Sequence, residues 1–434
     1  MPDVLVCGDW HLASVTAAGL VQLGYVVHIR PGDPGAADDV AFEEIAAGRR
    51  AANEPRVADI LAAARAEGAL RAVLDDAQTA NVLRAARLSL VAYDTVTAAD
   101  GTVTDSRPAV TTEKLLRHRE RSGPVVLLSQ VRAGTSDAAV TAAGLQAGSP
   151  DLVHLPENLR LGHAVPDFLH PARVIVGCNA PEVPAAVRTL LSQLSAGTVL
   201  TMSLVEAELV KHATNAYLAA CITLANDVGT IAGHLGADPA TVLDGVRADE
   251  RVADRAPLRP GEAYAGATLH RDVRALCERG ELIGRDGLFR AIARANTVHA
   301  LAPLAVLDRR LDGLAGRRIC LLGLTYKPGV STLRDSPGLR LARELRAQGA
   351  DVTAYDPVAE AADLPGMRRC DSLAAAACDA DCVALVVEHE AFTDPTGFDG
   401  LAPRGRVLLR LTGSERRSRV ATPPGWESVS TWSG

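Results

Sequence analysis

Short apolar runs alternate with amphipathic patterns along the first part of the chain. An apolar run at residues 4–7 is followed by a polar turn, a helical pattern over 12–23 and a second apolar run at 25–29. This order of strand, turn, helix and strand predicts a βαβ unit. Further apolar runs alternate with helical stretches, which favours a parallel, doubly wound sheet ending near residue 198. These runs lie at residues 72–74, 89–92, 125–128 and 152–155.

The middle of the chain has helical periodicity and almost no strand signal. The pattern over residues 204–235 predicts one unusually long helix, and further helices are expected over 239–246 and 288–311. We therefore predict a helical connecting domain, in which the long helix could also supply a dimer interface.

A second βαβ opening follows this section. A run at residues 318–324 leads through a glycine-containing turn to a helix over 337–348 and a strand over 351–355. Runs at 382–387 and 406–411 extend the second sheet, and the last dozen residues are predicted to form a loose tail.

The predicted fold class is thus α/β, with two Rossmann-like doubly wound domains joined by a helical connecting domain. The expected boundaries are 1–198 for the first domain, 199–313 for the helical domain and 314–434 for the last domain.

Composition and charge narrow the class of protein. Hydrophobic residues make up 48% and charged residues 22% of the 434 positions, which is typical of a globular protein. The net charge of -7 argues against a nucleic-acid partner. We find no secretory leader pattern and no apolar run of about 18 residues, so we expect a cytoplasmic protein without a membrane partner.

Eight cysteines are scattered along the chain, several of them inside apolar runs. Since none has metal-site spacing with further ligands nearby, we expect buried free thiols and no metal.

Lys211 and Asn215 lie at positions i and i+4 of the predicted long helix, so they share one face. A buried lysine beside an amide could hold an oxyanion or a carboxylate. The alternative is a solvated lysine beside a capped asparagine, and the pair alone does not decide between them.

Four segments, in order, resemble motifs of the UDP-glucose/GDP-mannose dehydrogenase family. Residues 156–162 read Pro-Glu-Asn-Leu-Arg-Leu-Gly, against the family's P-E-F-L-x-E-G. Residues 206–219 resemble A-E-L-x-K-x-x-x-N-A-x-L, and residues 258–272 resemble L-R-P-G-x-G-x-G-G-S-C-x-x-K-D. Residues 323–337 resemble G-x-A-F-K-x-x-T-D-D-x-R-x-S-P, and Tyr-Asp-Pro follows at 355–357. Chance agreement of all four in this order is very improbable.

The resemblance implies an NAD-binding domain, a helical domain, a domain that binds the nucleoside diphosphate, and a homodimer. It also implies oxidation of a sugar hydroxyl in two steps through a thiohemiacetal on a cysteine. By resemblance, Lys211 and Asn215 stabilise oxyanions, Asp272 assists water and Glu157 supports acid/base steps. The residues implied to lie near a nucleoside-diphosphate sugar are Leu159, Arg259, Tyr264, Gly266, Lys327 and Arg334.

The catalytic cysteine of the family motif is absent from this sequence. Thr268 stands in its place, and a threonine hydroxyl has no accessible anionic form near neutral pH without a dedicated base. Cys277, nine residues later, is not expected to replace it. We therefore do not expect a four-electron oxidation.

The predicted cofactor site is altered as well. A dinucleotide fingerprint needs glycine at its second position, but only Gly8 and Ala13 fit and Trp10 puts an indole there. Asp9 is expected to repel phosphate at the same helix start. Arg30 replaces the acid that would bind ribose hydroxyls, so NADP is conceivable in place of NAD.

Two further positions depart from the family's motifs. Gln130 stands where a threonine is expected, and Leu161 where a second glutamate is expected.

Three functions remain open. In the first, the protein binds a UDP-hexose or hexuronic acid and performs redox-neutral or transiently redox chemistry, such as coupling or group transfer in antibiotic assembly. In the second, it is a two-electron NAD(P)-dependent dehydrogenase. In the third, it is a non-catalytic nucleotide-sugar sensor or the partner of an active paralogue.

Overall fold

The computed structural model describes most of the chain and divides it into two compact units, Met1–His212 and Ala213–Gly434. The predicted three-domain boundaries stay a prediction. The described residues are 2–33, 36–97, 103–118, 120–253, 255–325, 327–333, 336–359, 366–393, 398, 405–411, 418 and 420–432.

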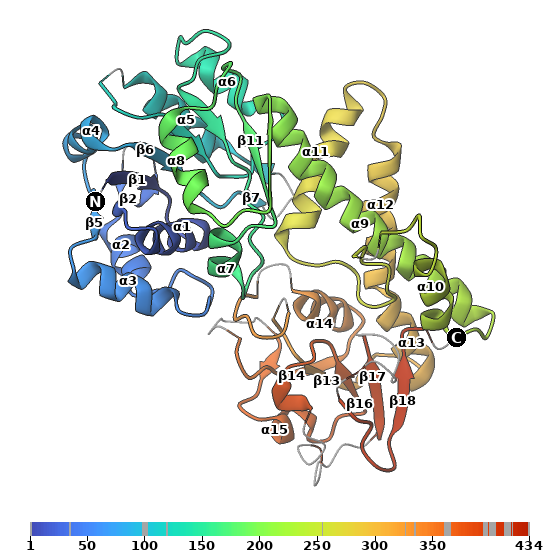
Figure 1. Cartoon of the computed structure of the whole chain (residues 1–434). Coiled ribbons are helices and arrows are strands. Elements are labelled where there is room, and N and C mark those ends of the chain that lie inside the picture. Colours follow the sequence, from blue (N-terminus) through green and yellow to red (C-terminus); the bar gives the residue numbers. More distant parts are fainter. Residues whose placement is uncertain are drawn as a thin grey trace. The chain divides into compact units, whose positions relative to one another are not determined.

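The first unit contains a sheet of eight strands in the order β12-β11-β10-β9-β6-β1-β2-β5 (Figure 1). Neighbouring strands are parallel except β10 and β11, and β12 starts at the predicted end of the first domain. Its strands are β1 Asp3–Cys7, β2 Val26–Arg30, β5 Leu70–Ala72, β6 Leu88–Val91, β9 Val125–Leu127, β10 Leu152–His154, β11 Arg173–Gly177 and β12 Thr198–Met202. Two short antiparallel pairs lie outside the sheet: β3 Gly32–Asp33 with β4 Ala36–Ala37, and β7 Val96–Thr97 with β8 Val103–Thr104.

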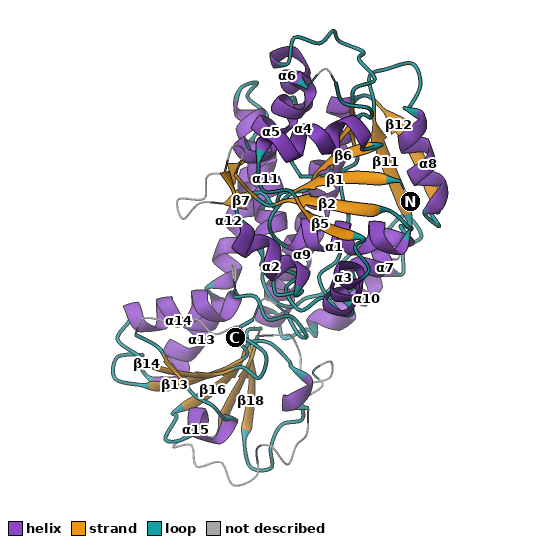
Figure 2. Ribbon diagram, turned by 90° about the vertical axis from the view of Figure 1, so that its left-hand side faces the viewer, coloured by secondary structure: helices purple, strands orange, loops and turns teal. Residues whose placement is uncertain are grey.

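Helices cover both faces of this sheet (Figure 2). Val4 and Val6 of β1 belong to one core cluster, while Leu5 and Cys7 belong to another, as the alternation of side chains along a strand requires. This buried sheet, covered on both faces, confirms the predicted doubly wound class. The helices are α1 His11–Gln22, α2 Asp39–Ala46, α3 Val57–Ala66, α4 Asp76–Ala85, α5 Ser106–Arg117, α6 Thr135–Ala142, α7 Ala164–Leu169 and α8 Ala185–Gln193.

A helical section follows. Helix α9, Leu204–His234, has the predicted length, but the single helix predicted over 288–311 is two helices that meet at Leu301. Pro303 stands in the first turn of the second one, a position that a proline tolerates because its missing N–H has no partner there. The helices of this section are α10 Pro239–Arg247, α11 Ala267–Glu281, α12 Gly287–Ala300 and α13 Ala302–Leu311.

By length and composition, α9 could cross a membrane. Its most apolar window has a mean hydropathy of 1.2, and 44% of that window is buried inside the protein. Core helices pass the same test, so this property carries little weight.

The second unit also contains a parallel sheet, with the order β15-β14-β13-β16-β17-β18. Helices α13 and α14 pack on one face through the cluster around Ile319 and Leu321, and α15 packs on the other through the cluster around Cys320. The elements are β13 Arg318–Leu322, α14 Pro337–Ala347, β14 Asp351–Tyr355, β15 Arg368–Arg369, α15 Leu373–Ala377, β16 Cys382–Leu385, the 3-10 helix η1 Glu390–Phe392, β17 Val407–Arg410 and β18 Glu427–Ser430.

The prediction of a loose tail is wrong for the described residues. Strand β18 pairs with β17, and Trp432 is buried against His299 with ring centroids 5.0 Å apart. The segment rich in Ser, Pro and Thr contains strand β18 and the buried Trp432. Their pairing and packing hold the described part of this segment in place.

Candidate active site

The turn between β1 and α1 requires small residues at two positions. A Cβ atom on Gly8 would lie 2.3 Å from the carbonyl oxygen of Ala92 and 2.8 Å from Cβ of Ala13. Close packing of strand and helix therefore explains both small residues. Trp10 is half-buried at the N-cap of α1 and makes no side-chain capping bond.

A carboxylate of the protein itself binds the start of α1. The backbone N–H of Leu12 donates to Oδ2 of Asp94 over 3.0 Å. Asp9, which was expected to repel phosphate here, instead accepts a bond from Arg107 over 2.6 Å. The sequence pattern did not single out Asp94, because it lies in the loop after β6 and not in the fingerprint.

Arg30 at the end of β2 is also bound internally. Its guanidinium donates to the carbonyl oxygen of Asp75 at 3.0 Å, to Oγ1 of Thr79 at 2.6 Å and to Oδ1 of Asp76 at 2.6 Å. The Arg30 guanidinium, which was expected to bind a 2'-phosphate, therefore donates its hydrogen bonds within the protein.

The residues present do not fit a dinucleotide in the ordinary Rossmann pose. That pose places the pyrophosphate on the N–H groups at the start of the first helix. Here Asp94 accepts from one of those groups, and Trp10 is the N-cap residue of the helix, at the fingerprint position that needs a glycine.

A cavity of about 330 Å³ lies nearby in the same unit. Its volume falls in the range of small-molecule sites. Its lining includes the basic residues Arg30, Lys114, Arg117 and His118 together with the acidic Asp76.

Gln130 is buried and bonded to the start of α9. Its amide nitrogen lies 3.1 Å from Nδ1 of His212, and Nε2 of His212 lies 2.9 Å from the carbonyl oxygen of Val131. These distances place the proton of a neutral His212 on Nε2, so that Gln130 donates to Nδ1. Gln130 is thus packed inside the unit, and its predicted cofactor contact stays a prediction.

Lys211 anchors the loop that carries Glu157. Its ammonium group donates to the carbonyl oxygen of Glu157 over 2.5 Å and to Oδ1 of Asn158 over 3.3 Å. Oε2 of Glu157 accepts the backbone N–H of Leu159 over 2.7 Å. Lys211 is 6% exposed, which excludes the solvated-lysine interpretation.

Glu54 holds the other end of this loop. Its carboxylate accepts the N–H of Gly162 at 2.6 Å and of Ala164 at 3.1 Å, and lies 3.0 Å from Nε2 of His11. Burial raises the pKa of Glu54, but these bonds outweigh that effect and lower it overall. The loop with Glu157 is therefore fixed from two sides, by Lys211 and by Glu54.

His11 is a titratable group that the sequence pattern did not reveal. Burial lowers its pKa, but the bond to Glu54 and the charges of Asp94 and Glu157 outweigh burial and raise it overall. A histidine that opens a helix gives no sequence signal, because its carboxylate partners come from three distant loops.

In the second unit, Asn215 and Asp272 are in direct contact. The Asn215 amide donates to Oδ2 of Asp272, and Nε of Arg271 donates to Oδ1 over 3.0 Å. Asp272 is fully buried and Asn215 is 7% exposed. Two residues predicted to be catalytic are thus brought together, while their roles stay predictions.

Three further predicted site residues lie at or before the start of α11, and they differ in exposure. Gly266 adopts φ +75° at the N-cap of α11, and Thr268 in the following turn is exposed. Tyr264 is buried against the ring of His270, with centroids 4.7 Å apart. Burial, with the charge of Cys277, raises the pKa of Tyr264 to about 12.

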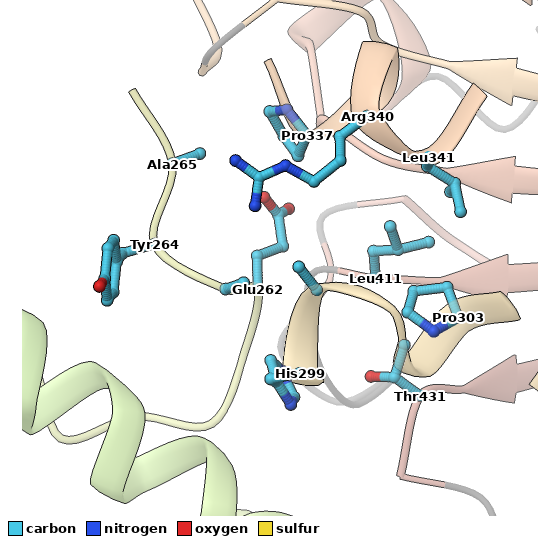
Figure 3. A pocket seen from close by; sticks show the side chains of 12 residues that line it. Glu262, Tyr264, Ala265, His299, Pro303, Pro337, Arg340, Leu341, Leu411 and Thr431 are labelled. Carbon is cyan, nitrogen blue, oxygen red and sulfur yellow. The ribbon is translucent and has the colours of Figure 1, made fainter. Parts of the chain in front are cut away.

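Glu262 in the same segment lines a small cavity of about 30 Å³, room for one or two waters. Figure 3 shows its carboxyl end directed toward Arg340 of α14. Burial and the charge of Glu388 raise the pKa of Glu262 to about 8. Its carboxyl therefore keeps its proton to a higher pH than an ordinary glutamate does, which the sequence pattern did not indicate.

The remaining predicted substrate residues are less informative. Leu159 packs against the core of the first unit, Arg259 is exposed, and Lys327 is half-buried. Arg334 lies outside the described residues.

The thiols are all free, but they are not all buried as expected. Cys378 is exposed, and Cys277 and Cys370 are partly exposed. Among the residues that the structure describes, no group of three or more His, Cys, Asp or Glu side chains could hold a metal ion.

Two mainly parallel sheets covered by helices, with a long helix after the first, define an α/β protein of the doubly wound, Rossmann-like class. Family models identify the class more narrowly. The chain matches the NAD binding domain of the UDP-glucose/GDP-mannose dehydrogenase family over residues 4–195, its central domain over 205–298 and its UDP binding domain over 320–407. The chain therefore belongs to the UDP-glucose/GDP-mannose dehydrogenase family, as the motifs predicted.

Curated relatives agree with this family. The chain is 32% identical over 284 residues to the UDP-glucose 6-dehydrogenase AglM of Haloferax volcanii, covering 62% of this chain and 66% of the relative. It is 27% identical over 361 residues to the UDP-glucose 6-dehydrogenase YwqF of Bacillus subtilis, covering 82% and 80%. The match to the UDP-glucose 6-dehydrogenase of Rickettsia typhi spans 57% of that relative's length.

Solved structures share the whole fold. A UDP-glucose dehydrogenase from Pyrobaculum islandicum superposes with a TM-score of 0.83 at 27% identity, covering 98% of both chains. A UDP-D-ManNAc dehydrogenase from Pyrococcus horikoshii, at 20% identity and a TM-score of 0.82, shares the fold over 100% of this chain and 99% of the other.

Proposed function

We propose that this protein binds a nucleoside-diphosphate sugar, a UDP-hexose or hexuronic acid, and carries out redox-neutral chemistry on it. The match to a UDP binding domain supports the ligand class. Relatives whose names give UDP-glucose as substrate support the base and the sugar.

The observation that carries the redox-neutral assignment is the bond from the Leu12 N–H to the Asp94 carboxylate. A pyrophosphate and a carboxylate compete for the same partial positive charge at a helix start. An internal carboxylate is present at all times, so it disfavours the dinucleotide that an oxidation would consume. Thr268 in place of the family's cysteine removes the thiohemiacetal route as well.

The proposed chemistry uses acid/base and oxyanion groups. Glu157 and Asp272 serve as acid or base, and Lys211 and Asn215, one turn apart on α9, stabilise developing negative charge. Coupling or group transfer in a specialised pathway, such as antibiotic assembly, needs these groups but no net oxidant.

The second candidate function is a two-electron NAD(P)-dependent oxidation. The cavity of about 330 Å³ beside Arg30 favours it, because this volume and its cationic lining could accept an adenosine phosphate. It requires the Asp94 carboxylate and the Trp10 indole to move aside.

A homodimer in the cytoplasm is part of the proposal. Three apolar side chains at spacings of seven on α9 are exposed, namely Tyr217 at 53%, Leu224 at 54% and Ile231 at 60%. A stripe at this spacing is typical of a helix that packs against another helix. Replacing Leu224 by Glu should lower the mass measured by light scattering to that of a monomer, whereas the exposed Leu282→Glu serves as the control.

The function is tested with a panel of UDP-, GDP- and ADP-sugars. We expect calorimetry to show binding of a UDP-sugar to the full chain in the absence of NAD. Mass spectrometry should then find a product of unchanged oxidation level once the acceptor is supplied. Failure of every nucleotide sugar to bind would overturn the proposal, and conversion only with NAD or NADP would favour the second candidate.

A further inference from the structure

Residues Thr431 and Trp432, which follow β18, pack onto the helical section within the second unit. Trp432 is 7% exposed, and its indole stacks on the imidazole of His299 in α12, with ring centroids 5.0 Å apart and planes 25° apart. Thr431 lines the same small cavity as His299 and Glu262 (Figure 3). None of the proposed roles uses this contact.

Two glycines of α9 make room for Trp432. A Cβ atom on Gly233 would lie 2.5 Å from the carbonyl oxygen of Trp432, and one on Gly229 would lie 3.1 Å from the indole carbon Cζ3. Glycine is unfavourable inside a helix, and the close approach of Trp432 explains why two stand one turn apart here. The Cβ atom of Pro260 is also 3.1 Å from that position on Gly229. The indole therefore lies on α9 beside the segment that begins near Pro260.

His299 connects the indole to this segment, residues 258–268, which carries Tyr264, Gly266 and Thr268. The Nε2 atom of His299 lies 2.8 Å from the carbonyl oxygen of Gly261. Because a carbonyl oxygen only accepts, this distance places a proton on Nε2. One imidazole thus binds the segment through its edge and contacts the indole through its face.

Two buried asparagines hold the same segment from two helices. Asn226 of α9 donates to the carbonyl oxygen of Glu262 at 3.0 Å and accepts the N–H of Gly261 at 3.0 Å. Asn296 of α12 accepts the N–H of Tyr264 at 2.8 Å and donates to its carbonyl oxygen at 3.0 Å. Both asparagines are 1% exposed. The backbone of the segment is therefore fixed by side chains of α9 and α12.

We propose that Trp432 is a positioning residue for residues 258–268: by packing on His299 and on α9, it keeps this segment in the conformation that receives a nucleotide sugar. Asn296 and His299 lie three residues apart on one face of α12, so support at His299 acts on both side chains that bind the segment. The inference rests on the proposed function for its ligand, whereas the order of the segment can be measured without one.

The first test is hydrogen exchange of the full chain without ligand, measured by mass spectrometry on peptides that cover residues 258–266. Trp432→Ala should speed exchange of the Gly261 and Tyr264 amides at least about ten-fold, because local opening becomes easier once the support is removed. Peptides from β13 and β16 should exchange as in the wild type. Trp432→Phe keeps an aromatic ring on His299 and should restore most of the protection.

Gly233→Ala tests the same support from α9, because the new Cβ atom must displace the carbonyl oxygen of Trp432. It should speed exchange in residues 258–266, although alanine favours the helix. Gly245→Ala in α10 is the matched control, since a Cβ atom there meets nothing within 4 Å, and it should leave this exchange unchanged. Unchanged exchange in folded Trp432→Ala protein would overturn the proposal, as would an equal rise in β13 and β16, which would mean only a general loss of stability.

The second test is calorimetry with UDP-glucose. Trp432→Ala should raise Kd at least about five-fold and Trp432→Phe less than about two-fold, because binding to the alanine variant must also order the segment. Faster exchange with an unchanged Kd would contradict the positioning role. If UDP-glucose does not bind the wild-type chain, the proposed function fails, while the exchange test still decides whether Trp432 supports the segment.

Discussion

The turns that follow β1 and β13 share a tightly packed glycine. They differ in the carboxylate that binds the backbone N–H groups of each turn. Gly8 follows β1 and Gly323 follows β13, and each donates its N–H to the neighbouring second strand, at Arg30 and Tyr355 respectively. A side chain at either glycine would collide with the strand beside it, at Ala92 or at Val387. The two sheets therefore impose the same local requirement on the sequence.

The difference lies in the charges around each turn. In the second unit, Oδ2 of Asp356 accepts the N–H groups of Leu324 at 2.6 Å and Thr325 at 2.9 Å, and the carboxylate is buried beside His389. In the first unit, Asp94 accepts the N–H of Leu12 at 3.0 Å. Asp356 thus clamps its turn through two backbone N–H groups, whereas the turn in the first unit has the Asp94 cap and, beside it, the buried His11–Glu54 pair.

The largest expected effect is the loss of stability when Asp356 is replaced. Replacing Asp356 by Ala leaves buried N–H groups and His389 without their acceptor, so it should lower the free energy of unfolding by about 3–5 kcal/mol. The bonds hold the pKa of Asp356 well below its usual range, so the loss should shrink as pH falls through the acid range. Urea denaturation at several pH values measures this, with exposed Asp371→Ala as control. A loss below about 1 kcal/mol would remove the distinction between the two turns.

The next largest effect is expected at Glu262, whose pKa is raised where that of Asp356 is lowered. The pKa of Glu262 is raised to about 8, so the folded state keeps a proton that the unfolded state releases above about pH 4.5. Stability should therefore fall by up to about 1.4 kcal/mol per pH unit between those values. Glu262→Gln should abolish that slope, and Glu388→Gln should reduce it. Thermal unfolding from pH 5 to 8.5 decides the matter, and an equal slope in the Gln variant would contradict the assignment.

Removing Asp94 sharpens the comparison at the first turn. Asp94→Ala should cost only about 1 kcal/mol, the usual value of a lost helix cap. It should also uncover the Leu12 N–H and strengthen NAD binding at least about ten-fold. Calorimetry with NAD on both proteins measures the change, and Asp356→Asn in the other unit is the control that should not bind NAD better. Unaltered NAD affinity would show that Asp94 is not the barrier.

The smallest effect concerns Asp9. Its partner Arg107 is 33% exposed, so Arg107→Ala should cost less than about 1 kcal/mol of stability. The uncovered Asp9 carboxylate should weaken anion binding at this turn, and equilibrium dialysis with pyrophosphate is the measurement. Stronger pyrophosphate binding in the variant would mean that Arg107, and not Asp9, governs the local charge.

Most strands of both sheets follow from local periodicity, as β14 shows by matching its predicted range of 351–355, but β11 and β12 were not among the predicted runs. Periodicity did not reveal β18, because a four-residue edge strand between prolines and serines carries little pattern. Motif order located Lys211, Asn215 and Asp272, and the structure adds the direct contact of the last two.

Other parts of the candidate site could not be predicted. His11, Glu54 and Asp94 are separated by dozens of residues and meet only because the carboxyl ends of parallel strands lie at one edge of the sheet. Single-sequence reasoning detects spacing along one element, and these three residues share none. For the same reason, the sequence pointed to Asp9 as the carboxylate at the start of α1, where the structure has Asp94 bound to the Leu12 N–H.

The redox-neutral assignment is tested most directly by a calorimetric titration of NAD into the wild-type chain saturated with UDP-glucose. We expect heat from the UDP-glucose titration and none from NAD, with no reduced nicotinamide formed. Binding of NAD at micromolar concentration, with absorbance of the reduced cofactor appearing as UDP-glucose is consumed, would contradict it and make the protein a dehydrogenase.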